Sequence, residues 1–198
     1  IAYAVNSENL KQLLNDNRCF KCDLSLVNLA NAKLSGANLV FADLRGADLT
    51  GASLLRASLE FADLRGADLR GTYFGFADLQ GADLTDAKLK GISLNGADLT
   101  NAKLKGANLR SIFLNGVELK SANLGYADLR GADLRNAYLV SADLSGANLQ
   151  GANLSNANLS GANLSLVNLS KANLQKANLS SATMYNCNLQ EANLSEVN

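Results

Sequence analysis

The side chains that most often carry enzyme chemistry are scarce in this chain. Its 198 residues contain no histidine, so the Ser-His and Cys-His pairs that activate a nucleophile cannot form. No glycine-rich phosphate loop or metal-spaced cluster is present in the sequence. Two stacked carboxylates such as Asp63 and Asp83 could share acid and base roles. Because Asp and Asn recur throughout at one equivalent position, we interpret them as a solvated surface. We expect no enzymatic activity and no cofactor.

Cysteines are the other reactive side chains, and there are three. Cys19 and Cys22 form a Cys-x-x-Cys pair, whereas Cys187 lies far along the chain. With no histidine and a distant third cysteine, a metal site is not expected. A local disulfide between Cys19 and Cys22 would fit an oxidising compartment. Free thiols and a redox or metal-binding pair are the alternatives.

A five-residue repeat positions all of these side chains. From residue 22 to the end the chain keeps one phase of A-[D/N]-L-x-x, as in Ala42-Asp43-Leu44-Arg45-Gly46. Phe74 and Met184 replace the leucine. Five residues fit neither the 3.6-residue period of a helix nor the two-residue period of a strand. The chain must therefore turn once per repeat.

Each repeat is predicted to form a short wall and a corner. In an extended segment, residues two apart point the same way, so Ala and Leu share an interior while Asp or Asn faces water. The last two positions make the corner, and glycine is frequent at the second of them, as at Gly46, where a tight bend favours a residue without a Cβ.

Departures from the repeat predict how many walls close one coil. Lys33, Ser53, Tyr73, Ser93 and Phe113 break the Asp/Asn rule at twenty-residue intervals. The bulky interior residues Ile92 and Ile112 are also twenty apart. Four repeats per coil is the simplest explanation, and the coils would stack as a solenoid.

The repeated motif resembles the pentapeptide-repeat family over roughly nine-tenths of the chain. The resemblance implies an all-β fold, a right-handed quadrilateral β-helix. We place this β-helix at residues 20–198, in about nine coils. Residues 1–19 form the preceding segment. There, residues 6–15 predict a short helix with Ser7 as N-cap and with Leu10, Leu13 and Leu14 on one face. The helix should cap the first coil, with an amphipathic partner-binding helix as the alternative.

The two ends suggest where the protein works and how it associates. Ala2-Tyr3-Ala4 has the small-x-small form of a signal-peptidase site. The opening, with a short helix and Cys-x-x-Cys, is also similar to exported pentapeptide proteins of cyanobacteria and the thylakoid lumen. We therefore expect export to a periplasm or thylakoid lumen, with the cytoplasm as the alternative. At the other end the pattern stops in mid-repeat at Val197, which predicts either a cut or a covered coil, including an end-to-end homodimer.

Two surface features stand out from the repeat and mark the expected partner surface. Basic residues occupy one corner position at twenty-residue spacing: Arg70, Lys90, Arg110 and Arg130. Exposed apolar residues gather at the wall that loses its Asp and Asn: Leu55, Tyr73, Phe76 and Phe113, with Phe41 and Phe61 near the far edge of that wall. A mixed-charge solvated face and aromatics that merely cover the corners are the alternatives.

The net charge limits the classes of partner that the protein is expected to bind. The 18 basic and 18 acidic residues cancel, which argues against binding to nucleic acid or to an anionic membrane. In the neutral second half, amide ladders are expected between Asn148 and Asn168 and between Asn153 and Asn173. We predict a rigid, non-enzymatic scaffold that binds another protein. Quinolone-resistance members of the family resemble DNA and bind DNA gyrase, so a DNA-mimic modulator of gyrase is one alternative. A purely structural spacer is the other.

Overall fold

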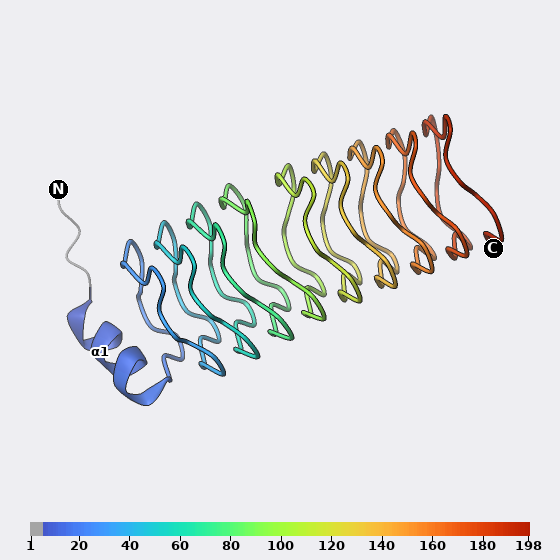
Figure 1. The fold of residues 1–198 in the computed structure, drawn as a ribbon. Coiled ribbons are helices and arrows are strands. Elements are labelled where there is room, and N and C mark those ends of the chain that lie inside the picture. Colours follow the sequence, from blue (N-terminus) through green and yellow to red (C-terminus); the bar gives the residue numbers. More distant parts are fainter. Residues whose placement is uncertain (1–5) are drawn as a thin grey trace.

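The computed structural model describes residues 6–198, so Ala2-Tyr3-Ala4 lies outside the described residues. One helix, α1 (Ser7–Asp16), precedes a stack of coils (Figure 1). Parallel bridges join residues twenty apart, from Arg18 with Asn38 to Asn173 with Asn193. Four repeats per coil are therefore confirmed. The ladder consists of isolated bridges and no extended strand within residues 6–198, because each wall has only three residues between corners.

Every corner has the same backbone geometry. The second corner residue has positive φ at every fifth position from Lys21 (φ 56°) to Glu196 (φ 57°). At every corner except that before Ile112, the N–H after it donates to the carbonyl three residues earlier, as from Ala47 to Leu44 at 3.0 Å, which is the pattern of a type II turn. Glycine fills only some of these positions. Phe, Tyr, Asn, Ser and Lys occupy others at a steric cost of about 1–2 kcal/mol each.

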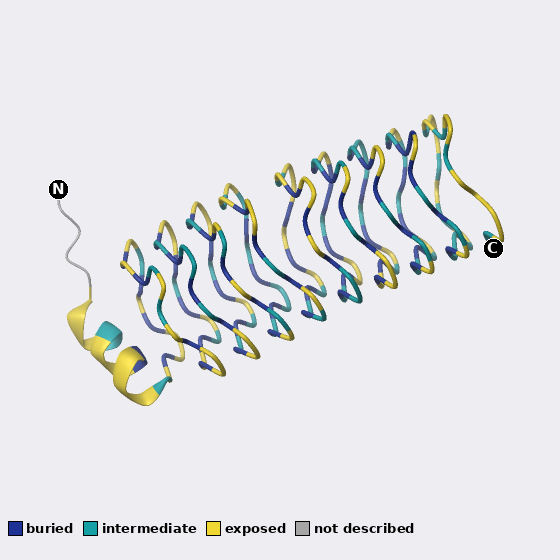
Figure 2. Cartoon of the chain, in the orientation of Figure 1, coloured by how far each residue is buried: buried dark blue, intermediate teal, exposed yellow. Residues whose placement is uncertain are grey.

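The interior is formed by the alanine and leucine columns. Leucines such as Leu44, Leu64 and Leu104 are fully or almost fully buried, as are alanines such as Ala62. Figure 2 shows buried and exposed positions alternating along the coils, with the corners mostly exposed. The predicted sharing of the interior by Ala and Leu is confirmed.

Helix α1 covers the first coil, as predicted, although two details of the prediction are wrong. The N-cap is Asn6, whose Oδ1 accepts from the N–H of Asn9 at 3.2 Å. Ser7 is instead the first helical residue. Leu13 is buried and Leu10 is half-buried, but Leu14 is exposed because it points away from the coil.

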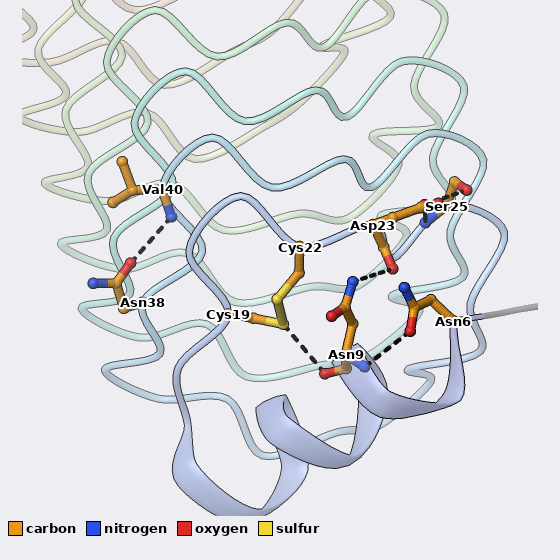
Figure 3. Close-up of a disulfide and its surroundings, with 8 residues drawn as sticks. All are labelled: Asn6, Asn9, Cys19, Cys22, Asp23, Ser25, Asn38 and Val40. Atoms are coloured by element: carbon orange, nitrogen blue, oxygen red, sulfur yellow. Dashed lines mark hydrogen bonds between the residues drawn. A yellow bond between two sulfur atoms is a disulfide. The ribbon is translucent and has the colours of Figure 1, made fainter.

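A disulfide joins Cys19 to Cys22 directly beside α1 (Figure 3). Both cysteines lie in the interior columns, Cys19 at a leucine position and Cys22 at an alanine position. The Sγ of Cys19 is 3.2 Å from the carbonyl oxygen of Asn9; a disulfide sulfur has no hydrogen to donate, so this is a packing contact. The side-chain amide of Asn17 donates to the carbonyl of Ser35 at 2.8 Å. These contacts fix α1 against the coils.

Hydrogen bonds between successive coils are complete from Cys19 to Asn198 except at one place, which we call the coil gap: residues 86–92 against residues 105–113. Five backbone bonds that the pattern requires are absent there. They are the bonds from the N–H groups of Asp86, Leu89, Gly91, Asn108 and Phe113 to the carbonyls of Lys105, Asn108, Arg110, Ala87 and Ile92, respectively. Figure 1 shows a wider space between these coils, in the green part of the chain. Elsewhere the coils stay joined.

The second half carries the predicted amide ladders in part. The side-chain amide of Asn173 donates to Asn153 at 3.4 Å, and that of Asn193 donates to Asn173 at 3.1 Å. On the neighbouring wall the bond runs from Asn188 to Asn168 at 3.3 Å, and the expected bond between Asn148 and Asn168 is not formed. Among the described residues, no helix has the length and apolarity needed to cross a membrane. The division at residues 1–19 and 20–198 and the end-to-end pairing stay predictions.

Candidate interaction surface

One wall differs from the other three in its outward residues. Bridges join Lys33, Ser53, Tyr73, Ser93 and Phe113 in a single column, as the twenty-residue spacing predicts. We call this column the aromatic wall. The Tyr73 and Phe113 side chains are each 61% exposed. Because Ser93 separates them, the two rings lie two coils apart.

Corner aromatics have a different environment from these wall aromatics. Phe76 is 64% exposed, yet its ring lies over the next coil, where a Cβ added to Gly96 would be 2.6 Å from it. Phe61 over Gly81 and Tyr126 over Gly146 repeat the arrangement, at 2.6 and 2.7 Å. These rings cover corner backbone. Of the predicted partner residues, Phe76 therefore packs over a glycine of the next coil, and so does Leu55, which would be 3.1 Å from a Cβ added to Gly75, whereas no glycine lies under Tyr73 or Phe113.

The aromatic wall lacks one hydrogen bond at every coil from Lys33 to Phe113, whereas the other walls lack it only at scattered positions such as Ser58, Lys88 and Tyr138. Where the outward residue is Asp or Asn, its Oδ1 commonly accepts from the N–H two residues later, as from Arg45 to Asp43 and from Ser165 to Asn163, both at 3.1 Å. The lysine, the serines and the aromatic residues of this column do not make this bond. The N–H groups at this edge of the aromatic wall consequently have no partner among the described residues; they belong to Ser35, Leu55, Gly75, Asn95 and Asn115. The wall presents free donors beside apolar rings.

The predicted basic ladder lies at the other edge of this wall. Its members are Arg70, Lys90, Arg110 and Arg130, all at the first corner position of successive coils. Arg70 pairs with Asp68 at 2.7 Å, and Arg130 pairs with Asp128. Lys90 and Arg110 make no ion pair with any described residue. The rungs without an ion pair are thus the two central ones, although the charge of Arg110 still helps to lower the pKa of Asp128.

Local sequence explains which rungs are neutralised. In an Asp-Leu-Arg segment the guanidinium reaches back to the carboxylate two residues earlier, with Arg70 Nε on Asp68 Oδ1 at 2.7 Å. This charged hydrogen bond is the main reason that the pKa of Asp68 is well below its usual range and that of Arg70 is raised. The residue two positions before Lys90 is Lys88, and the residue two positions before Arg110 is Asn108. Neither has a carboxylate at that position.

Phe41 and Phe61 do not border the aromatic wall, so the predicted placement is wrong. The wall of Asn38, Ser58 and Asp78 separates them from it. They form a separate cluster near α1, with Phe20 edge-on to Phe41 at 6.1 Å and Phe41 stacked on Phe61 at 5.1 Å between ring centroids. The sequence contained the signal, since the second corner position recurs at residues 41 and 61.

The stacked carboxylates Asp63 and Asp83, the predicted alternative for acid-base chemistry, are each bound to a cationic side chain. Asp63 binds Arg65, and Asp83 accepts from the Lys103 ammonium at 3.1 Å. Burial opposes ionisation of Asp83, but the hydrogen bonds from Thr85 and Lys103 lower its pKa. Both carboxylates are therefore ionised ion-pair partners and not an acid-base couple. Within residues 6–198, no three His, Cys, Asp or Glu side chains gather to hold a metal ion.

Comparisons with known proteins agree with the geometry. A family model described as pentapeptide repeats matches in overlapping segments from residue 22 to residue 198. HetL, a pentapeptide repeat protein involved in heterocyst differentiation regulation in the cyanobacterium Nostoc, is 35% identical; the match covers 98% of this chain and 97% of HetL, with a TM-score of 0.40. No curated protein sequence matches the chain.

Two further solved structures illustrate the spread of similar proteins. A pentapeptide repeat protein of the Arabidopsis thaliana thylakoid lumen is 34% identical, over 48% of this chain and 66% of that one, with a TM-score of 0.47. QnrB1, a plasmid-mediated fluoroquinolone resistance protein, is 17% identical over 91% of this chain and 93% of its own, with a TM-score of 0.40. With superpositions this loose, the sequence match to the repeat model decides the classification.

Proposed function

The chain belongs to the pentapeptide-repeat family, and on that premise we propose that it is a right-handed quadrilateral β-helix that works without catalysis, as a rigid scaffold for another protein. Four corners per coil and parallel bridges between residues twenty apart support the quadrilateral shape. A stack of this kind presents each wall as a flat, regularly spaced surface.

The aromatic wall is the observation that carries the proposal. Exposed aromatic side chains with unpaired backbone donors beside them suit a protein interface, because such surfaces combine apolar burial with directed hydrogen bonds. Tyr73 and Phe113 have no packing partner of the kind that holds Phe76. We infer that the partner covers Tyr73, Phe113 and the adjacent Leu55, which is 43% exposed.

The charge pattern disfavours a DNA mimic. A mimic needs unneutralised carboxylates, whereas Asp43, Asp63 and Asp133 are each bound by the arginine two residues later. The central charges of the basic ladder have the opposite sign to DNA. We therefore favour a scaffold for another protein over a DNA mimic that binds gyrase.

We also infer an oxidising compartment, the periplasm or the thylakoid lumen. The disulfide between Cys19 and Cys22 supports this location, because such bonds persist mainly outside reducing cytosol.

The test compares two variants in photo-crosslinking and affinity capture from native extract. The first variant is Tyr73→Ser/Phe113→Ser. The matched control is Tyr138→Ser/Tyr185→Ser, which removes two exposed tyrosines from other positions. A defined protein that crosslinks to residue 73 or 113 and is lost only with the first variant is the expected result. Equal capture by both variants would favour the structural spacer and reject the aromatic wall as an interface.

A further inference from the structure

The coil gap exposes backbone groups and free positive charge at the same corner. Ala87 and Ala107 are half-buried, whereas alanines in coils away from the gap and the ends are buried. Lys90 and Arg110 are consecutive rungs of the basic ladder on either side of the gap. Like charges on neighbouring coils repel each other, and an anion between them would offset the repulsion.

Interior volume explains why the coils separate here. In the column that contains Ala52 and Ala132, three successive coils instead have Thr72, Ile92 and Ile112, all buried. These are β-branched side chains at positions sized for a methyl group, stacked one above another. An interior packed to crystal-like density does not absorb such volume without moving backbone. The opening is therefore encoded in the column beside the basic ladder.

The opening contains a cavity of about 290 Å³ lined by Arg70, Ala87, Lys88, Leu89, Lys90 and Asn108. Two of the lining residues, Leu89 and Asn108, have unpaired N–H groups, and Gly91, next to the lining residue Lys90, has a third. The Lys88 ammonium is 3.3 Å from the Asp68 carboxylate, which Arg70 also binds. The negative charge of Asp68 is therefore neutralised by these two residues. Asp86, at the neighbouring corner, is the other acidic residue close to the gap.

We propose that the coil gap is a binding site for a small protonated oxyanion, hydrogen phosphate in particular. The Lys90 ammonium lines the cavity and supplies charge and a directed donor, and the N–H groups of Leu89 and Asn108 supply further donors. Arg110, on the neighbouring coil, adds positive charge beside the opening. Two backbone carbonyls at the gap are also unpaired. They belong to Asn108 and Arg110, which would otherwise accept from the N–H groups of Leu89 and Gly91. The hydroxyl of hydrogen phosphate can donate to such a carbonyl. Sulfate and a phosphomonoester dianion cannot.

This inference goes beyond the proposed scaffold function and does not depend on it. A small anion can bind with no partner present, and a partner can cover Tyr73 and Phe113 with no anion bound. An experiment that rejects one of the two proposals therefore leaves the other standing.

The experiment is a titration of the full chain with sodium phosphate at constant ionic strength, followed by amide NMR. We expect saturable shifts for Leu89, Gly91 and Asn108, with weaker binding of sulfate and of phosphoserine. Lys90→Gln/Arg110→Gln should lower phosphate affinity by at least about ten-fold, since each removes a charged donor. Lys33→Gln/Lys120→Gln is the charge-matched control at exposed positions away from the gap and should change little.

A second variant tests the geometry without touching a charge. Ile92→Ala/Ile112→Ala should let the coils close and should abolish phosphate binding although Lys90 and Arg110 remain. Shifts that do not saturate, or equal losses in both Gln variants, would mean general ionic screening and would overturn the site. Sulfate binding as tight as phosphate would overturn the preference for a protonated anion.

Discussion

An outward Asp or Asn does more than face water. Its Oδ1 accepts from the N–H of the first corner residue, as for Asn158 with Ser160 at 3.1 Å, and so satisfies a donor that would otherwise have no partner in the coil. Asp and Asn perform this task equally well, which explains why the repeat accepts either. Where the bond is missing, the wall gains free donors, and this is the case at the aromatic wall.

Corner glycines also have a second reason to be glycine. Gly96 has φ +64° and lies under the ring of Phe76, whereas Gly66 has φ +67° and nothing within 4 Å of an added Cβ. The bend alone does not demand glycine, because other residues adopt the same φ at equivalent corners. At Gly96 the large side chain of the preceding coil requires the space.

A double-mutant cycle at the residue scale follows from this pair. Gly66→Ala should cost only the strain of positive φ, about 1–2 kcal/mol. Gly96→Ala should cost more, because its Cβ meets the Phe76 ring. Adding Phe76→Ala should recover the excess in urea unfolding, so that the two substitutions are not additive. Equal costs for Gly66→Ala and Gly96→Ala would show that the ring simply moves aside.

At the scale of the coil, the stack is held by backbone bonds between neighbours and by interior side chains. The two contributions oppose each other where Thr72, Ile92 and Ile112 stack, and the side chains prevail over five hydrogen bonds. Each such bond contributes about 0.5–1.5 kcal/mol, so the separation has a cost comparable with that of a large core substitution. The gap is consequently sensitive to a single interior residue.

Ile112→Ala tests this balance. Buried Ile→Ala changes usually cost about 2–5 kcal/mol, but here we expect less than about 2 kcal/mol, because the coils can close and recover hydrogen bonds. Hydrogen exchange should show Leu89 and Gly91 newly protected. Leu154→Ala, a buried residue far from the gap with intact bonds, serves as the control and should cost the usual amount. Unprotected amides in Ile112→Ala would contradict volume as the cause of the gap.

At the scale of the whole molecule, ionisable groups are unevenly distributed. Paired Asp residues occur at 43, 63, 68, 83, 128 and 133, whereas residues 144–190 contain no acid. The second half instead uses amide ladders such as Asn153 with Asn173. The arginine-bound carboxylates therefore lie within residues 43–135, which we call the Asp segment, and residues 144–190 have none.

Acid should weaken the Asp segment selectively. Hydrogen bonds from arginine lower the pKa of Asp43, Asp63, Asp128 and Asp133 in the folded state. A lowered folded pKa adds stability above the unfolded value of about 3.9, and this stability is lost as pH falls below it. Urea unfolding followed by NMR at pH 7 and pH 3 should show the loss of stability in the Asp segment. Asp→Asn at these positions should reduce this loss, and an equal loss in residues 144–190 would refute the assignment.

The repeat made much of this architecture predictable. The period of five fixed the walls and corners, and Lys33, Ser53 and Tyr73 indicated four repeats per coil. Ile92 and Ile112 also appeared in the sequence as neighbours one coil apart, but their consequence depends on volume in three dimensions, where Thr72 joins them. The packing of Phe76 on Gly96 required the same knowledge. The N-cap of α1 was ambiguous because Asn6 and Ser7 are both good capping residues.

The coil gap is open on one side only. Bonds remain between Leu84 and Lys103 and between Gly96 and Asn115, at 3.0 and 3.2 Å, so the two parts of the rod stay attached along the opposite side. A rod whose two parts are joined along one side only bends easily toward and away from the open side and resists bending in the perpendicular direction. This protein should therefore flex about a fixed axis near residues 94–104, and whatever occupies the cut would set the stiffness of the rod.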